Sequence, residues 1–169
     1  MATDLGPLFG RFFQLGYVTR DGEAAAAQFR KRFAPVEFDV LANTAPNPIT
    51  ISVKRIYLAW IGQTMVELIE VNDAVPSIYR DYLPATQSDI RLHHFGYLID
   101  DYPATLRRLE EEGYDIPFRI SYGNVNDCCY ADTRAQLGHY LEYIRLGEEG
   151  RKWFSAIPGF QKLPDSQPV

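Results

Sequence analysis

The chain contains 169 residues, of which 46% are hydrophobic and 23% are charged, and its formal net charge is −5. This length suits one domain, or two small modules that share a core, and the composition argues against an intrinsically disordered chain. An acidic chain lacks the basic field that releases counterions from nucleic acid, so we expect no nucleic-acid partner.

No Arg-rich or apolar leader opens the sequence, and no apolar run reaches about 18 residues. We therefore expect a cytoplasmic protein with no membrane partner. The two cysteines, Cys128 and Cys129, are adjacent, a spacing that ordinarily precludes an unstrained disulfide between them. We interpret them as small buried residues of a strand.

The first predicted strand carries the phrase QLGYVTRD at residues 14–21. Asp21 suits the N-cap of a helix with the sequence DGEAAAAQFRKRF, because its carboxylate accepts hydrogen bonds from the first free backbone N–H groups. Three β-rich segments follow, VEFDVL, ITISVKRIYLAWI and TMVELIEV. The polar segment after them is broken by Pro76 and Pro84, so residues 73–90 are predicted to form a connection over the surface.

The same layout then repeats. HFGYLIDD at residues 94–101 echoes QLGYVTRD at a constant offset. Asp101 again suits an N-cap, Pro103 falls in the first helical turn, and Gly113 suits the end of the helix. The strands predicted after this helix are DIPFRI, NVNDCCYAD and HYLEYIRL. Each half thus contains a strand, a helix and three further strands.

A last short helix is predicted in EEGRKWFSAI, where Trp153, Phe154 and Ile157 recur at helical spacing. We expect these side chains to pack against the body of the protein or in a dimer contact. The predicted sections are one domain at 11–146 with modules at 11–72 and 91–146, an inter-module connection at 73–90, and a C-terminal extension at 147–169.

Four predicted strands each place one polar side chain on an otherwise apolar or small-residue face. Gln14 and His94 occupy the same position in the two copies of the repeated phrase, and Glu67 in VELIEV matches Glu142 in LEYIRL. A carboxylate buried without a partner is costly, and convergence on one cation would remove that cost. Nitrogen and oxygen donors suit a divalent Zn, Mn, Co, Ni or Fe ion. The alternative is that the carboxylates edge a wet cleft while the other two side chains bond to backbone groups.

These phrases and their order resemble the vicinal-oxygen-chelate superfamily, also called the glyoxalase and bleomycin-resistance family, over residues 11–146. The resemblance implies an α+β fold in which two βαβββ modules form one cupped, eight-stranded mixed sheet with helices on its outer face. It implies a divalent metal in the cup, bound by Gln14, Glu67, His94 and Glu142, and it favours a homodimer that acts on a small molecule.

That ligand set is of the kind seen in eukaryote-type glyoxalase I, whereas the segment CCYADTRAQLGHYLEYI is more similar to epimerase-like members of the family. The resemblance implies a metal-dependent enzyme that stabilises an enediolate, an isomerase, epimerase or lyase acting on a small carbonyl compound or thioester. Glu142 is the candidate base that also ligates the metal, and Glu67 is the second candidate base.

Two other functions within the family are considered. The alternative is a metal-free module of the bleomycin-resistance type that sequesters a small molecule, although such members usually lack the ligand set that is complete here. An extradiol dioxygenase of the family uses two His and one Glu around Fe(II). Gln14 stands where one His is needed, which argues against this function.

Several residues near these strands also have predicted roles. His93 is expected to point away from the cup, and His139, on the strand face opposite Glu142, is expected at its rim. Lys54 or Arg55, whichever faces the cup, is expected to receive an anionic substrate.

Overall fold

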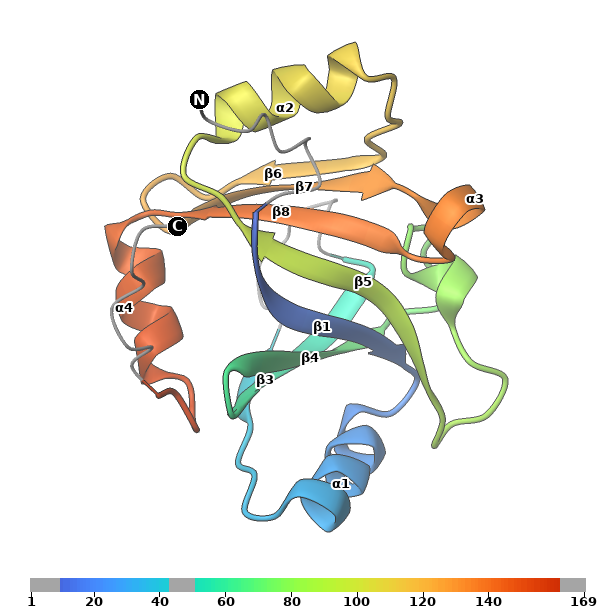
Figure 1. The fold of residues 1–169 in the computed structure, drawn as a ribbon. Helices are drawn as coiled ribbons and strands as arrows, with labels where there is room; N and C mark the ends of the chain where they lie inside the picture. Colours follow the sequence, from blue (N-terminus) through green and yellow to red (C-terminus); the bar gives the residue numbers. More distant parts are fainter. Residues whose placement is uncertain (1–9, 43–50, 162–169) are drawn as a thin grey trace.

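The computed structural model describes residues 10–42 and 51–161, which form one curled eight-stranded sheet with helices packed on it (Figure 1). The strands are β1 (Arg11–Thr19), β2 (Asp39–Ala42), β3 (Val53–Ile61), β4 (Thr64–Val71), β5 (Ile90–Leu98), β6 (Phe118–Ser121), β7 (Asn126–Asp132) and β8 (Tyr140–Leu146). The helices are α1 (Gly22–Phe33), α2 (Tyr102–Glu111), α3 (Arg134–Leu137) and α4 (Glu148–Ala156), with a 3₁₀ helix η1 (Arg80–Tyr82). This architecture confirms the predicted α+β fold.

One predicted strand is shorter in the structure, and the helices also bear on the membrane prediction. Residues 49 and 50, the expected start of one long strand, lie outside the described residues, and β3 begins at Val53. Among the described helices, none is both long enough and apolar enough to cross a membrane.

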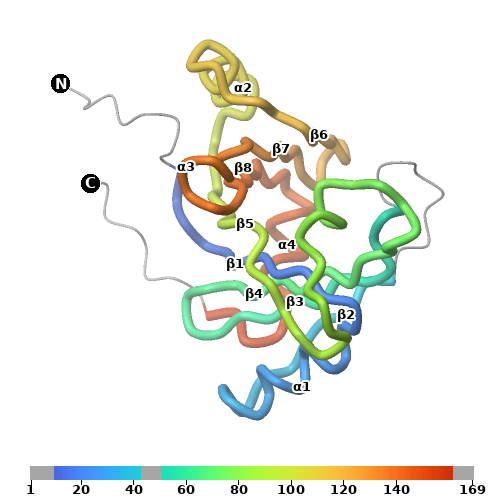
Figure 2. Tube along the Cα trace, turned by 90° about the vertical axis from the view of Figure 1, so that its right-hand side faces the viewer, coloured from blue at the N-terminus to red at the C-terminus, as the bar shows by residue number. Residues whose placement is uncertain are grey.

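The strand order is β2-β3-β4-β1-β5-β8-β7-β6. In the first half of the sheet β1 lies parallel to β4, and in the second half β5 lies parallel to β8. The halves meet where β1 and β5 pair in antiparallel fashion at the centre of the sheet (Figure 2). Because these two strands carry the repeated phrases in opposite directions, Leu15 pairs with its equivalent Phe95, and the residue on either side of it pairs with the other copy: Gln14 with Gly96, and Gly16 with His94.

Alternation along the strands gives the sheet two distinct faces. On β4, Val66 and Leu68 pack beneath α1, whereas Met65 belongs to the largest buried cluster on the other side. In the second half, Leu141 packs with Leu109 of α2. We call the face beneath α1 and α2 the outer face, and the opposite face the inner face. Figure 1 shows α1 and α2 near the two ends of the curled sheet.

Both module helices begin at the predicted aspartates. Oδ1 of Asp21 accepts the N–H of Ala24 at 3.0 Å, and Oδ1 of Asp101 accepts the N–H of Ala104 at 2.9 Å. Each such cap contributes about 0.5–2 kcal/mol. Gly113 follows α2 with a φ of +79°, a conformation that glycine adopts at little steric cost.

Helix α4 packs against the inner face. Phe154 and Ile157 belong to the largest buried cluster, and Trp153 packs at its edge. Nε1 of Trp60 on β3 donates to the carbonyl oxygen of Phe154 at 3.1 Å. The predicted packing of these side chains against the body of the protein is confirmed, and α4 covers one end of the inner face (Figure 1).

The connection at 73–90 was predicted to run over the surface, but part of it is buried. Tyr79 and Tyr82, which flank and end η1, are each 6% exposed and belong to the largest buried cluster. The hydroxyl of Tyr82 also donates to the carbonyl oxygen of Gly138 at 3.1 Å. The prediction rested on prolines and polar residues, and it left out two aromatic rings that bury against the inner face.

Candidate functional site

Gly16 of β1 brings two of the predicted donors together. It pairs with His94 on β5 and with Glu67 on β4, so these side chains approach each other from the strands on either side. A Cβ atom at Gly16 would overlap the imidazole ring of His94. Only a glycine leaves room for this ring to lie across β1.

Gly96 of β5 does the same for the other two donors. It pairs with Gln14 on β1 and with Glu142 on β8. A Cβ atom at Gly96 would lie 2.6 Å from Oε1 of Gln14. Each copy of the repeated phrase thus supplies the glycine across which the donor of the other copy lies, which explains why LGY and FGY both carry it.

His94 stands between the two carboxylates. Its Nε2 is 3.2 Å from Oε2 of Glu67 and 3.2 Å from Oε2 of Glu142. The ligand-type atoms of these three residues all lie within 4.8 Å of one another. His94 is 0% exposed, Gln14 3% and Glu142 5%. The structure therefore gathers the predicted donors on the inner face, while their roles as ligands and bases stay predictions.

The gathered donor atoms have no hydrogen-bond partners. Oε1 of Gln14, Oε2 of Glu67, Nε2 of His94 and Oε2 of Glu142 are all buried and unpartnered. The contacts of His94 with the carboxylates are at ion-pair distance but lack hydrogen-bond geometry. The amide nitrogen of Gln14 donates to Sδ of Met65 at 3.6 Å, which leaves its oxygen free.

Such a set of atoms fits a divalent cation. Leaving one polar atom buried and unpaired costs about 1–3 kcal/mol, and more for a charged group. One imidazole nitrogen, two carboxylates and an amide oxygen suit ions of the Zn, Mn, Co, Ni or Fe type. A bound ion would satisfy the atoms of Glu67, His94 and Glu142, which lie within 4.8 Å of one another, and Gln14 lines the same cavity as the two carboxylates.

Protonation of the site follows from burial and from charge. Burial alone would lower the pKa of His94, but the nearby carboxylates of Glu142 and Glu67 outweigh it and raise that pKa to about 9. Burial also raises the pKa of Glu67. In metal-free protein, a proton on His94 therefore compensates part of the negative charge, and a metal ion would displace that proton.

His93 was not among the predicted donors, yet it contacts the site directly. The pairing of β1 with β5 shifts register between Gly16 and Tyr17, and this bulge places the His93 ring beside His94, among the buried tyrosines Tyr79 and Tyr130. The prediction that His93 points away was therefore wrong. Strand alternation holds only between bulges, and nothing in the local sequence marks this one.

The contacts of His93 fix the tautomer of His94. Nε2 of His93 lies 3.2 Å from the carbonyl oxygen of Ile78, which can only accept, so this nitrogen carries a proton. Burial and the neighbouring His94 lower the pKa of His93 well below its usual value, so its Nδ1 is bare. That Nδ1 lies 3.0 Å from Nδ1 of His94, which must therefore donate. The lone pair of neutral His94 then remains on Nε2, as a metal ligand requires.

A cavity of about 340 Å³ opens onto the donors, with Gln14, Glu67 and Glu142 at its floor. Its apolar walls are formed by Leu41, Ala42, Val53, Ile56, Leu58, Phe118, Ile120, Val125, Ile144, Trp153 and Phe154. Its remaining polar lining is neutral and consists of Tyr79, Tyr122, Asn126, Cys128 and Tyr130. The volume lies near the lower end of the range for small-molecule pockets, about 300–1,000 Å³.

Three other residues with predicted roles lie outside this cavity. Neither Lys54 nor Arg55 lines it, and Nε of Arg55 instead pairs with Oε2 of Glu70 at 2.8 Å. The prediction that one of them receives an anionic substrate was therefore wrong. His139 does not line the cavity either, because its ring packs on that of Phe95 with a centroid distance of 4.2 Å.

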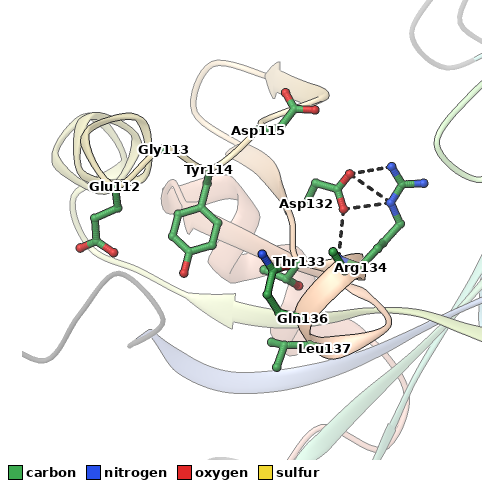
Figure 3. A pocket seen from close by; sticks show the side chains of 10 residues that line it. Glu112, Gly113, Tyr114, Asp115, Asp132, Thr133, Arg134, Gln136 and Leu137 are labelled. Atoms are coloured by element: carbon green, nitrogen blue, oxygen red, sulfur yellow. Dashed lines mark hydrogen bonds and ion pairs between the residues drawn. The ribbon is translucent and has the colours of Figure 1, made fainter.

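A larger hollow of about 800 Å³ lies elsewhere, between the end of α2 and α3 (Figure 3). There, Nε of Arg134 donates to the two carboxylate oxygens of Asp132 at 2.9 and 3.0 Å. The charges of these two side chains therefore compensate each other. Of the described residues that line it, none has a buried polar atom without a partner. We therefore place the candidate site in the smaller cavity, where the unpartnered donors lie.

Comparison with known proteins places these observations in a family. A family model described as the Glyoxalase/Bleomycin resistance protein/Dioxygenase superfamily matches residues 13–130. No curated protein matches the sequence.

Solved structures with the same fold include several epimerases. The methylmalonyl-CoA epimerase of Mycobacterium tuberculosis is 11% identical, with a TM-score of 0.64 over 90% of this chain and 97% of its own. A methylmalonyl-CoA epimerase in complex with methylmalonyl-CoA and NH₄⁺ is 15% identical, with a TM-score of 0.62 over 82% and 96% of the two chains. A variant of the Streptomyces coelicolor enzyme in complex with 2-nitronate-propionyl-CoA is 16% identical, with a TM-score of 0.62 over 82% and 96%. At these identities the likeness establishes the fold alone.

Proposed function

Because the chain belongs to the glyoxalase/bleomycin resistance protein/dioxygenase superfamily, we propose that it is a metal-dependent isomerase or epimerase that moves a proton at the carbon beside a carbonyl group. Its substrate is a small carbonyl compound or thioester. The observation that carries the proposal is the pair of carboxylates, Glu67 and Glu142, which flank the buried His94 and line the floor of an apolar cavity.

Gln14, Glu67, His94 and Glu142 are the proposed metal ligands. A divalent ion bound there supplies a Lewis acid, which polarises the substrate carbonyl and lowers the pKa of the neighbouring C–H bond. Support comes from their four unpartnered atoms and from the tautomer of His94, whose Nε2 lone pair faces the carboxylates.

Glu142 and Glu67 are the proposed bases. They reach the floor of the cavity from β8 and β4, on opposite sides of the central strand pair. Burial raises the pKa of Glu67 in the metal-free protein, whereas a bound cation would favour its charged form, so a carboxylate that accepts and returns a proton would need a loosened bond to the metal. A base on each side of a planar intermediate removes the proton from one face and returns it to the other, which is epimerisation. A single base returns the proton on its own side, which is isomerisation when the proton reaches a different carbon.

The similar structures support the choice of proton transfer. Their names describe methylmalonyl-CoA epimerases, and an epimerase inverts one carbon by exchanging its proton. The carboxylates of this chain offer the same type of chemistry, and their placement rather than the likeness of fold carries the assignment.

Exchange of the substrate α-hydrogen with deuterated water tests the proposal. The Zn²⁺-loaded protein is assayed on methylglyoxal with glutathione, on a methylmalonyl thioester and on simple 2-hydroxyketones. Glu142→Gln and Glu67→Gln keep an oxygen at each position but remove the base, so exchange should fall by about 10²- to 10⁴-fold. Loss in one variant identifies a single base, and loss in both identifies two.

Glu70→Gln is the matched control. Glu70 lies on β4 as Glu67 does, but its carboxylate pairs with Arg55 and does not line the cavity. Exchange should therefore persist in this variant. Undiminished exchange in both site variants would remove the carboxylates from the mechanism, and a wild-type protein that exchanges none of the panel would contradict the proposed reaction.

A further inference from the structure

Building on the proposed function, we infer that the substrate is a neutral carbonyl compound with an alkyl or aryl substituent, and that the cavity rejects carboxylated substrates. The walls of the cavity, the placement of the surrounding cations and the charge balance at its floor determine this selectivity for the same site.

The walls of the cavity are apolar on every side that the described residues form. One side consists of aliphatic residues of β2 and β3, such as Leu41 and Ile56, and the opposite side includes Phe118 and Ile120 of β6. Trp153 of α4 contributes an aromatic ring. Each alkyl or aryl carbon that a substrate brings against these walls leaves water, which favours binding.

No Lys or Arg side chain is among the described residues that line the cavity. Two cations on the strands that form it pair with carboxylates elsewhere. Arg55 on β3 pairs with Glu70 at 2.8 Å, and Arg119 on β6 pairs with Glu110 at 2.7 Å. The walls therefore provide no counter-charge for an anionic substrate.

Arg145 on β8 completes this pattern. Its Nε donates to Asp127 at 2.7 Å, and it alternates along the strand with Ile144, which lines the cavity. The guanidinium group of Arg145 therefore lies on the other side of the sheet from the substrate. A strand residue that could have met an anion is thus occupied by a carboxylate of the protein.

With a divalent ion bound, the charges at the floor of the cavity would already sum to zero before a substrate enters. Glu67 and Glu142 carry two negative charges when ionised, and a divalent ion carries two positive charges. A substrate carboxylate would add one uncompensated negative charge beside apolar walls, where an unpaired charge is costly. A neutral substrate adds none.

The other polar atoms of the cavity are neutral hydrogen-bonding groups. Tyr79 and Tyr130 line it and present phenol hydroxyls. Asn126 adds a neutral amide. These groups can orient a hydroxyl or a carbonyl of the substrate, but they do not neutralise an anion.

A pair of compounds that differ in charge tests the inference. Zn²⁺-loaded protein is assayed for α-hydrogen exchange on para-methyl and para-carboxylate derivatives of α-hydroxyacetophenone, each rate being divided by its uncatalysed rate. An apolar pocket disfavours a single added hydroxyl by about 100-fold, and a carboxylate is harder to desolvate. The para-methyl compound should therefore show a kcat/KM at least about 100-fold higher. Equal values, or a preference for the carboxylate, would overturn the inference and leave the proposed reaction intact.

Adding a cation to the wall supplies the reciprocal test. Ile56→Arg places a guanidinium in the cavity and should reduce the preference for the neutral compound by about tenfold or more. Val40→Arg is the matched control, because Val40 lies on the neighbouring strand β2, is 45% exposed and does not line the cavity. It should leave the preference unchanged. Val125→Arg tests the same point from the opposite wall if Ile56→Arg fails to fold.

Binding separates failure of the inference from failure of the proposed function. If neither compound undergoes exchange, the proposed reaction is contradicted for this class, and the dissociation constants of the two compounds still measure the charge preference. Trp153 lines the cavity, so tryptophan fluorescence reports their binding to the Zn²⁺-loaded protein. Tighter binding of the neutral compound by at least about 100-fold would support the inferred selectivity, and equal affinities would overturn it.

Discussion

Replacing Gly16 by alanine tests whether the repeated glycines hold the donors in place. The added Cβ would overlap three atoms of the His94 ring, Cε1, Nε2 and Nδ1, far inside van der Waals contact. The backbone of β1 cannot easily yield, because it is paired with β4 on one side and with β5 on the other. The imidazole must therefore turn away from Glu67 and Glu142.

Two quantities should change, and their sizes follow from this overlap. Overpacking a filled site typically costs about 1–3 kcal/mol of the free energy of unfolding. For a chain of this length, each kcal/mol lowers Tm by about 2–4 °C. Losing the orientation of a ligating His typically lowers metal affinity by about 10–100-fold, which corresponds to about 1.4 kcal/mol for each factor of ten.

The assay is a calorimetric titration of Zn²⁺ into chelator-treated protein, with thermal unfolding measured in parallel. Gly22→Ala is the control, since a Cβ at Gly22 would overlap the ring of Tyr57, which packs beneath α1 on the outer face. Both variants should lose stability, and only Gly16→Ala should lose affinity for Zn²⁺. Equal Zn²⁺ affinities in the two folded variants would refute the account of how the glycine positions His94.

Four further predictions concern the donors and their surroundings. His93→Phe cannot accept from Nδ1 of His94, so Zn²⁺ affinity should fall about 10–100-fold, whereas His93→Gln retains an acceptor and should lose less; the same titration measures both. Because the pKa of His94 is raised to about 9, Zn²⁺ binding at pH 7 should release about one proton, counted by calorimetry in buffers of different ionisation enthalpy. In metal-free protein, the stability linked to this raised pKa is fully present below the unfolded value of about 6.5 and is lost as pH rises through about 9, which urea unfolding at several pH values measures. Phe154→Ala removes a buried ring and should cost about 3–5 kcal/mol in urea unfolding, while Phe33→Ala, at a side chain that is 49% exposed, should cost far less.

The sequence repeat was sufficient to predict two modules of a strand, a helix and three strands and to select the four donors, and the resemblance to the superfamily added that the modules form one cupped sheet. A constant offset between two phrases implies two copies of one module, and the N-cap aspartates and strand patterns then follow from local chemistry. The donors were found because Gln14 and His94 differ within otherwise matching phrases, and because each carboxylate interrupts an apolar strand. These are properties that alternation along a regular strand preserves.

The surroundings of the site were harder to predict, because they depend on bulges and on long-range packing. The pairing of β3 with β4 shifts register between Val53 and Arg55, so counting alternate residues did not show which of Lys54 and Arg55 faces the cavity. A bulge likewise made the alternation rule fail for the direction in which His93 points. The burial of Tyr79 in the connection depends on contacts with strands far along the chain, and no local pattern predicts such contacts.

The two bulges at the central pair are themselves related by the repeat. On β1 the register shifts between Phe12 and Gln14, which leaves Phe13 unpaired, and on β5 the corresponding unpaired residue is His93. Both residues come immediately before a donor, and both are buried on the inner face. Bulges of this kind re-aim side chains beside functional sites.

The two inward-turned residues need different neighbours, and the chain supplies them from outside the repeats. Phe13 packs on Phe154 of α4 with a centroid distance of 5.8 Å, whereas His93 packs on Tyr79 of the connection at 4.9 Å. The amide of Gln14 has no tautomer to fix, so an apolar neighbour is sufficient beside it. The imidazole of His94 must keep its proton on Nδ1 to present a lone pair at Nε2. A hydrogen-bonding residue is therefore required at this one of the two equivalent positions, and the bonds from His94 through His93 to the carbonyl of Ile78 tie the inter-module connection to the chemistry of the site.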